Sequence, residues 1–172
     1  MKPAKRYFIL FLISIISFFL QCTILRKIAL ASVSPNLLLI LPASIGYLYG
    51  SREGMFTGFC CGILIDLFYG NFIGLYALLY LYIGYLNGYF RDFYFEKGLR
   101  TPLIFIGLSD LLYGFAEYVL FFLLRGKFNF DYYLTHIILP ELVYTMLLAV
   151  PVFFALFRHA QRRQQRSNPF AS

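Results

Sequence analysis

Residues 58–70 read GFCCGILIDLFYG, an apolar run that holds two adjacent cysteines, glycines four residues apart and a single aspartate, Asp66. A carboxylate in the middle of a membrane span raises the free energy of insertion by roughly 2.5 to 3.5 kcal/mol, and glycine is a poor helix former in water. Both residue types are expected where helices pack closely together inside a membrane. The stretch therefore predicts a helical membrane protein with a polar group in its interior.

The composition of the whole chain is that of a membrane protein. Its 172 residues are 60% hydrophobic and only 13% charged, far from the balance of a soluble globular domain. The net charge of +7 comes from short basic clusters between apolar runs and near both ends, which suits anionic lipid headgroups better than nucleic acid. We predict a single all-α integral membrane domain that contacts membrane lipids and binds no nucleic acid.

Six apolar segments approach the roughly 20 residues with which a helix crosses about 30 Å of hydrocarbon. The predicted transmembrane helices are 7–24, 34–50, 53–70, 72–90, 102–124 and 132–157. The weakest boundary lies at Gly70 and Asn71, where a turn gives a tight hairpin and a bend gives five spans instead of six. Residues 53–90 are too long for one span, which favours the turn. The domain then covers residues 1–157, and residues 158–172 form a basic tail.

The distribution of basic residues predicts the orientation. With a cytoplasmic N-terminus, 11 of the 15 Lys and Arg residues lie inside, and the four on the outside are Arg26, Lys27, Arg125 and Lys127. Because basic residues accumulate on the cytoplasmic side, both termini are expected in the cytoplasm, which requires an even number of spans. The basic residues of the tail that are expected at the inner membrane surface are Arg158, Arg162, Arg163 and Arg166.

Glycines recur at four-residue spacing through the middle of the chain, and Asp66 occupies one step of this series. Three of them form G-x-x-x-G-x-x-x-G within the third predicted span, a surface without side chains on which another helix can approach closely. We therefore expect the third span to be central in the bundle. The glycines that are candidates for contact with a partner are Gly54, Gly58, Gly62, Gly70 and Gly74.

Four carboxylates lie within predicted spans that contain no Lys or Arg, namely Asp66, Asp110, Glu117 and Glu141. Such groups must be protonated, hydrated in a cavity, or matched by a cation from outside the chain. Asp66 follows Gly62 by four residues and so is expected to face the packed interior. Two interpretations remain open: each acid hydrogen-bonds a nearby tyrosine or backbone group, or the acids share a cavity or docking groove. For the set as a whole, we favour the shared cavity or groove.

The fourth predicted span is rich in tyrosine. Its hydroxyl groups either supply hydrogen-bond partners to the buried acids or belong to rings that simply pack against neighbouring helices. The spacing of the residues does not decide between these alternatives. The tyrosines concerned are Tyr76, Tyr80, Tyr82, Tyr85 and Tyr89.

Recognisable catalytic motifs are absent from the sequence. It contains neither G-x-S-x-G nor H-E-x-x-H, and Asp66 and Asp110 both lack the G-x-G-D context of intramembrane aspartyl proteases. The three cysteines, Cys22, Cys60 and Cys61, are odd in number and two are adjacent, so we interpret them as small packing residues rather than as a disulfide framework. We expect neither an enzyme nor a cofactor or metal site.

Three stretches resemble the bacterial rod shape-determining membrane protein family MreD: SPNLLLILPASIGYLYG at 34–50, GILIDLFYG at 62–70 and NFIGLYALLYLYIGYLNGYFRDF at 71–93. That family shows a proline followed by a polar residue and a leucine-rich helix, then D-L-x-x-G with a second glycine four residues on. The matching residues here are Pro35, Asn36, Asp66, Leu67, Gly70 and Gly74. Pro140, Pro151 and the basic tail also fit the family, and the resemblance covers essentially the whole chain.

The resemblance implies a noncatalytic scaffold of the machinery for bacterial cell elongation, located in the inner membrane. Its partner would be a single-span protein of the MreC type and, indirectly, the MreB filament and the RodA-type peptidoglycan synthase complex. The resemblance also implies a compact six-helix bundle like the substrate-binding S components of energy-coupling-factor vitamin transporters. The alternative function is therefore that of an S component, but the first span, FILFLISIISFFL at 8–20, lacks the A-x-x-x-A that such subunits often carry.

Overall fold

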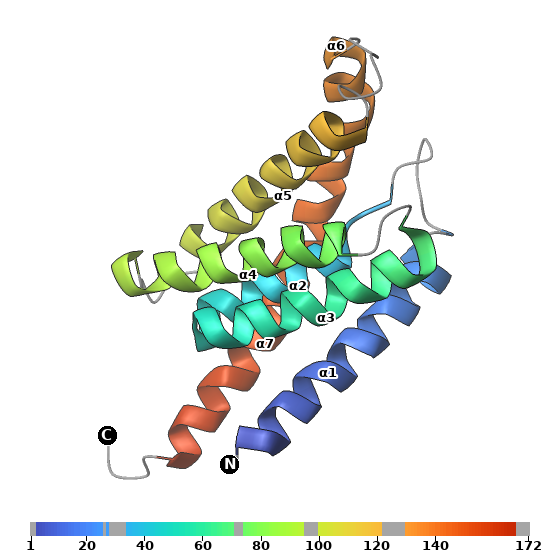
Figure 1. Cartoon of the computed structure of the whole chain (residues 1–172). Helices are drawn as coiled ribbons and strands as arrows, with labels where there is room; N and C mark the ends of the chain where they lie inside the picture. Colours follow the sequence, from blue (N-terminus) through green and yellow to red (C-terminus); the bar gives the residue numbers. More distant parts are fainter. Residues whose placement is uncertain are drawn as a thin grey trace.

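A computed structural model of the protein describes residues 3–25, 27, 34–70, 74–94, 100–121 and 130–167. All secondary structure in this part of the chain is helical, which confirms the all-α prediction (Figure 1). Short π-helical turns at Gln21–Leu25 and Leu134–Ile138 extend α1 and join α6 to α7. The α-helices are α1 (Pro3–Leu20), α2 (Leu37–Tyr49), α3 (Ser51–Tyr69), α4 (Leu75–Tyr94), α5 (Arg100–Phe121), α6 (Phe130–Tyr133) and α7 (Leu139–Ser167).

The six predicted segments correspond to α1, α2, α3, α4, α5 and the continuous run from α6 through α7. The boundary at Gly70 is a true end of α3, so the third and fourth segments are separate helices. The predicted basic tail begins within α7, which continues without a break through Ser167. The wide turn before Pro140 suits a residue that has no backbone N–H and whose ring would clash with the preceding helical turn.

Three of the described helices are long and apolar enough to cross a membrane, at Ala4–Leu25, Arg100–Leu120 and Leu134–Gln161. The other helices differ from the expectation for physical reasons. α2 has only 13 residues and is therefore about 20 Å long, shorter than the hydrocarbon layer. α3 contains glycines and Asp66, and α4 is rich in tyrosine, so both have lower hydropathy than the three candidate spans.

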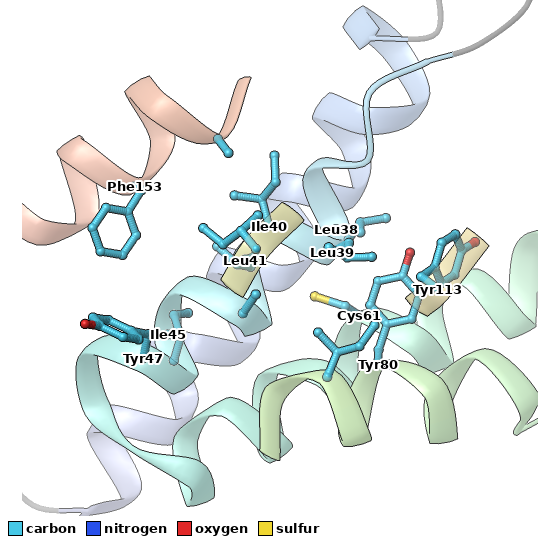
Figure 2. Close-up of a cluster of buried hydrophobic side chains, with 14 of the residues drawn as sticks. Leu38, Leu39, Ile40, Leu41, Ile45, Tyr47, Cys61, Tyr80, Tyr113 and Phe153 are labelled. Carbon is cyan, nitrogen blue, oxygen red and sulfur yellow. The ribbon is translucent and has the colours of Figure 1, made fainter. Parts of the chain in front are cut away.

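α2 lies at the centre of the molecule. Its sequence, LLLILPASIGYLY, has little polar character on any side, and twelve of its residues are buried. A helix that is apolar all round is buried when other helices surround it, and here it contacts α3, α4, α5 and α7. In Figure 2, Phe153 of α7 lies on one side of the α2 leucines and Tyr80 of α4 on the other.

The expectation that the third span is the central one is wrong. α3 buries its glycine-rich face but exposes Phe59, Leu67 and Phe68 elsewhere on its surface. Small residues permit close approach on one face only, whereas the all-round apolar sequence of α2 requires cover on every side.

α2 and α3 form a very tight antiparallel connection. α2 ends at Gly50, whose φ of +110° lies in the region that residues with a Cβ rarely adopt, and α3 begins at the next residue. The N–H of Gly50 donates to the carbonyl oxygen of Gly46 at 2.8 Å, and the N–H of Gly54 donates to the Gly50 carbonyl at 3.1 Å. This turn brings the start of α3 directly beside the end of α2.

α3 and α4 pack antiparallel with their backbones in contact. A Cβ atom placed on any of the three glycines of the G-x-x-x-G-x-x-x-G motif would overlap backbone atoms of α4. The glycine face therefore does what its pattern predicts, but the helix that occupies it belongs to the same chain. The facing pairs are Gly54 with Gly84, Gly58 with Tyr80, and Gly62 with Ala77.

One end of the molecule collects the N-terminal end of α1, the α2–α3 turn and the C-terminal part of α7. Arg6 forms an ion pair with Glu53 at 2.9 Å, and its guanidinium carbon lies 5.1 Å from the centroid of the Tyr49 ring. A small cavity of about 60 Å³ at this end is lined by Arg6, Tyr49 and His159, among others. The N-terminal end of α1 and the C-terminal end of α7 thus lie at the same end of the molecule (Figure 1).

The substitution Gly58→Ala is expected to lower the free energy of unfolding by roughly 1 to 3 kcal/mol, because the new methyl group overlaps the Tyr80 backbone of α4. Reversible SDS unfolding in mixed micelles measures this change. The control is Gly107→Ala, whose methyl group meets the flexible Met146 side chain at 3.2 Å and should shift the free energy by less than about 1 kcal/mol. Equal stability of the two variants would contradict the backbone contact between α3 and α4.

Candidate functional site

Asp66 caps the N-terminus of α4. Its carboxylate accepts hydrogen bonds from the N–H groups of Gly74 at 2.9 Å, Tyr76 at 3.1 Å and Ala77 at 2.9 Å, and the side chain is only 2% exposed. The first amides of a helix have no partner within the helix, and its N-terminus carries a partial positive charge. A carboxylate that accepts three of these N–H groups therefore stabilises the α3–α4 hairpin. Asp66 faces the interior, as the sequence predicts. Its role there is to cap the N-terminus of α4.

The two glycines that follow Asp66 shape this turn. Gly74 has a φ of +102°, and a Cβ on Gly70 would overlap the backbone of Asp66. The N–H of Gly70 donates to the carbonyl oxygens of Ile65 and Asp66, which closes the end of α3. The pattern Asp66, Gly70, Gly74 is therefore a local device that ends one helix and starts the next, and both glycines are used within the chain.

A partly open cavity of about 350 Å³ lies between the end of α1, the start of α2, and α3, α4, α5 and α7. Two of the four predicted acids line it, Glu117 from α5 and Glu141 from α7, whereas Asp66 and Asp110 do not. The structure thus brings together part of the predicted set. The remaining polar residues of the wall include Gln21, Cys22, Ser34, Asn36, Tyr80 and Tyr113, and its apolar residues include Phe18, Leu38 and Ile65.

Glu117 is held by tyrosine hydroxyl groups. Tyr76 donates to its Oε1 at 2.9 Å and Tyr113 at 3.5 Å, and the hydroxyl of Tyr133 also hydrogen-bonds this carboxyl group. Tyr76 therefore connects two acids, because its backbone N–H is bound by Asp66 and its hydroxyl by Glu117. The sequence left open whether the tyrosines of this span bind the buried acids or only pack. Tyr76 hydrogen-bonds an acid.

The other tyrosines of α4 behave differently from Tyr76. Tyr80 is fully buried and donates its hydroxyl hydrogen to Asn36 Oδ1 at 3.0 Å rather than to an acid. Its ring packs edge-on against that of Tyr113, with centroids 5.5 Å apart. Tyr82, Tyr85 and Tyr89 are exposed on the outer side of the helix. Only one side of α4 therefore faces the cavity.

The buried N-terminus of α2 supplies the rest of the polar wall. Asn36 Oδ1 accepts the N–H of Leu39 at 3.1 Å, and the N–H of Asn36 donates to Thr145 Oγ1 at 3.1 Å. Gln21, at the end of α1, accepts the N–H of Leu37 and donates to the carbonyl oxygen of Pro35, both at 2.9 Å. These contacts fix α1 and α7 to the first turn of α2.

Sequence reasoning missed Gln21 and Thr145 and took Asn36 only as part of a family pattern. Usable signals were present. Asn36 stands directly before an apolar run, as helix caps do, and Thr145 follows Glu141 by one helical turn. Gln21 was the strongest signal, since an amide at the end of an apolar span needs a polar partner.

Among the acids whose side chains the structure describes, Asp110 is the most enclosed outside the α4 cap, with 4% of its surface exposed. It lies beside Thr145 and close enough to Glu141 for a charge interaction. Its Oδ1 atom has no hydrogen-bond partner in the part of the chain that the structure describes. The acids of α5 and α7 therefore gather in one region, with Asp110 enclosed and Glu117 and Glu141 on the cavity wall.

The remaining candidate residues belong to the C-terminal part of α7, and the described one, Arg158, does not line the cavity. Arg158 places its guanidinium carbon 5.4 Å from the centroid of the Phe154 ring, near the C-terminal end of α7. Arg162, Arg163 and Arg166 continue this helix, and their side chains lie outside the described part of the structure.

Cys60 and Cys61 are buried as predicted, whereas Cys22 lies on the cavity wall, and none of the three forms a disulfide.

Among the described residues, no group of three or more His, Cys, Asp and Glu residues is arranged to hold a metal ion. What the arrangement does offer is a concave polar surface inside a bundle of apolar helices, which is a means of binding. The fold and the cavity together define the class of the protein: a helical membrane protein with an internal polar cavity.

The family follows from comparison with known proteins. The family model described as rod shape-determining protein MreD matches residues 1–163, and the chain therefore belongs to the MreD family. No curated protein and no solved structure matches it. Membership of this family gives the protein a role in rod-shape determination and agrees with its apolar, membrane-embedded helices.

Two isosteric substitutions at buried acids should have different effects. Asp66→Asn replaces an acceptor of three N–H groups by a group that is part donor, and it should lower the free energy of unfolding by roughly 1.5 to 3 kcal/mol. Asp110→Asn removes a buried carboxylate that has one oxygen without a partner, and it should leave stability unchanged or raise it. SDS unfolding of both variants tests the cap, and a larger loss at Asp110 would contradict it.

Proposed function

We propose that this protein is a noncatalytic membrane scaffold of the bacterial cell-elongation machinery and that it binds a single-span partner of the MreC type. The observation that carries the proposal is the match of the MreD family model to residues 1–163. Through the partner, the scaffold would connect to the MreB filament and to a RodA-type peptidoglycan synthase complex in the inner membrane.

The internal contacts support the scaffold proposal. The cap on α4, the Asn36 network and the glycine contact fix α2, α3 and α4 to one another through backbone groups, which leaves these helices little freedom. Outside them, α1, α5 and α7 expose apolar residues to lipid or to other membrane helices, among them Phe8, Leu108 and Leu147. A rigid centre surrounded by exposed apolar helices offers a fixed surface on which the membrane helix of a partner can pack.

We further propose that the six helical segments all cross the membrane and that both termini are cytoplasmic. The Arg6–Glu53 ion pair and the cavity that Arg6 shares with His159 support this arrangement, because they join the N-terminal end of α1 to the C-terminal part of α7. Two termini at one end require an even number of crossings. The excess of basic residues at that end then assigns it to the cytoplasm.

A second function has one observation in its favour. The cavity volume of about 350 Å³ falls within the range of small-molecule sites, as a substrate-binding S component of a vitamin transporter would need. That the helical bundle shares its fold with such S components is part of the proposal of this second function. The absence of alanine from residues 8–20 argues against the contact with a coupling subunit that those proteins make.

The binding of an MreC-type protein is tested by affinity purification of the tagged full chain from native membranes. The expected result is stoichiometric copurification of the partner, together with loss of rod shape when the chain is depleted from cells. Purified protein is assayed in parallel for bound vitamins by mass spectrometry. A retained vitamin without an MreC-type partner would favour the transporter function and overturn the scaffold.

The six-span arrangement predicts the accessibility of single reporter fusions. Fusions after Arg52 and after Ser167 should show fluorescent protein activity, since that reporter is active in the cytoplasm, and no alkaline phosphatase activity. The matched fusion after Gly70, at the opposite end of α3, should show the reverse. Phosphatase activity at both Arg52 and Ser167 would indicate the inverted orientation, and opposite results at these two sites would indicate an odd number of spans.

A further inference from the structure

We propose that the cavity of about 350 Å³ is a receptor site for one organic cation, an ammonium or guanidinium group that lies between Glu117 and Glu141. The inference concerns the chemistry of the occupant. It rests on the proposed function only where the cation is taken to belong to a protein partner, and the charge preference of the cavity is independent of that function.

The charge on the wall is the first reason. Two carboxyl groups line the cavity, and none of the described residues that line it is Lys, Arg or His. The first turn of α2 also faces this region, but a helix N-terminus supplies only about half a positive charge, less than two carboxylates need. A buried carboxylate is costly unless it is paired, and a cation from outside the chain would supply the pairing that the described lining residues do not.

Asp110, which does not line the cavity but lies near Glu141, adds a second observation. This acid is more than nine-tenths buried, and its Oδ1 atom has no hydrogen-bond partner in the described part of the chain. It interacts with Glu141 across the region between α5 and α7. The described contacts therefore satisfy Glu117 through tyrosines but leave the Oδ1 atom of Asp110 without a partner, close to Glu141 of the cavity wall.

The shape and the aromatic lining define the size of the occupant. A volume of about 350 Å³ accommodates a small amine or one long basic side chain, whereas a whole helix is far larger. Tyr80 and Tyr113 are among the lining residues, and aromatic rings attract organic cations within about 6 Å of the ring centroid. Gln21 Oε1, which accepts one hydrogen bond from Leu37, adds a further oxygen acceptor at the wall that suits an N–H donor.

Two sources can supply this chemistry. One is a free amine or guanidine that diffuses into the cavity, and the other is a Lys or Arg side chain of the membrane partner. Both place the same group beside Glu117 and Glu141, so the electrostatic preference is tested first and the source second.

Cys22 allows the preference to be measured in the intact protein. Its thiol is partly exposed on the cavity wall, whereas Cys60 and Cys61 are buried in the helix core. The full chain in phosphatidylcholine nanodiscs is treated with a cationic reagent, trimethylammonioethyl methanethiosulfonate, or an anionic one, sulfonatoethyl methanethiosulfonate. Mass spectrometry follows the modification of Cys22. Relative to N-acetylcysteine, the cationic reagent should be preferred by at least about tenfold.

Charge-neutral variants assign the preference to the cavity. Glu117→Gln/Glu141→Gln should bring the ratio of the two rates to within about twofold of the N-acetylcysteine value. Glu141→Gln alone leaves the tyrosine hydrogen bonds of Glu117 in place. This single variant should lower the ratio of the two rates by part of the change seen in the double variant. Glu53→Gln is the control, since it removes a carboxylate at the opposite end of α3 and should leave the ratio unchanged. Equal rates of the two reagents in the wild-type chain would overturn the proposal.

Protection of Cys22 then identifies the source. Protection by ethylguanidinium or butylammonium chloride, but not by butanol or by sodium chloride of equal ionic strength, assigns a free cation. Protection only after co-expression with the MreC-type partner, lost in Glu117→Gln/Glu141→Gln, assigns a basic side chain of that partner. Absence of protection in both arms overturns the receptor site.

The two proposals fail separately. If the partner does not copurify with the wild-type chain, the scaffold function is refuted, while the charge preference of Cys22 measured without partner still stands. If the partner copurifies but Cys22 shows no charge preference, the receptor site is refuted and the scaffold function stands.

Discussion

The enclosure of α2 is the constraint on which the rest of the structure depends. This helix is apolar on all sides and only 13 residues long, so it is shorter than the hydrocarbon layer, and its N-terminal end is buried within the protein. At its C-terminal end, Gly50 reverses the chain directly into α3. At its N-terminal end, the unpaired amides of the first turn need polar partners from other helices.

That need explains the polar cavity. Asn36, Gln21 and Thr145 come from three different parts of the chain and meet at the first turn of α2. Once these groups are buried, further polar groups are easier to place beside them, because each can hydrogen-bond a neighbour instead of lipid. The tyrosines of α4 and the acids of α5 and α7 adjoin this turn, and the first turn of α2 favours their negative charge. The cavity is thus a consequence of burying the start of a short helix.

Much of this architecture could be read from the sequence, but the partners of individual groups could not. The apolar runs located all six helical segments, and Asp66 was placed correctly in the interior. Its role as the α4 cap depended on the turn at Gly74, whose positive φ is not encoded in a hydrophobic pattern. Likewise, the glycine motif of α3 predicts close packing but not which helix provides it. The centrality of α2 was visible only in its length and in the lack of a polar side.

The cavity lies at the boundary between two parts of the molecule that are held together in different ways. On one side, α2, α3 and α4 are fixed by glycine contacts and by caps that involve the backbone. On the other, α5 and the continuous α6–α7 run project away from these helices at the α6 end, as Figure 1 shows. Glu117 and Glu141 belong to this second part, and Asn36 and Tyr80 to the first. An occupant that contacts both parts of the molecule would favour the conformation in which the two parts face each other. The size of this effect is the difference between its affinities for that conformation and for others. Because the proposed receptor site spans this boundary, its occupancy would bias how the outer helices sit against α2, α3 and α4.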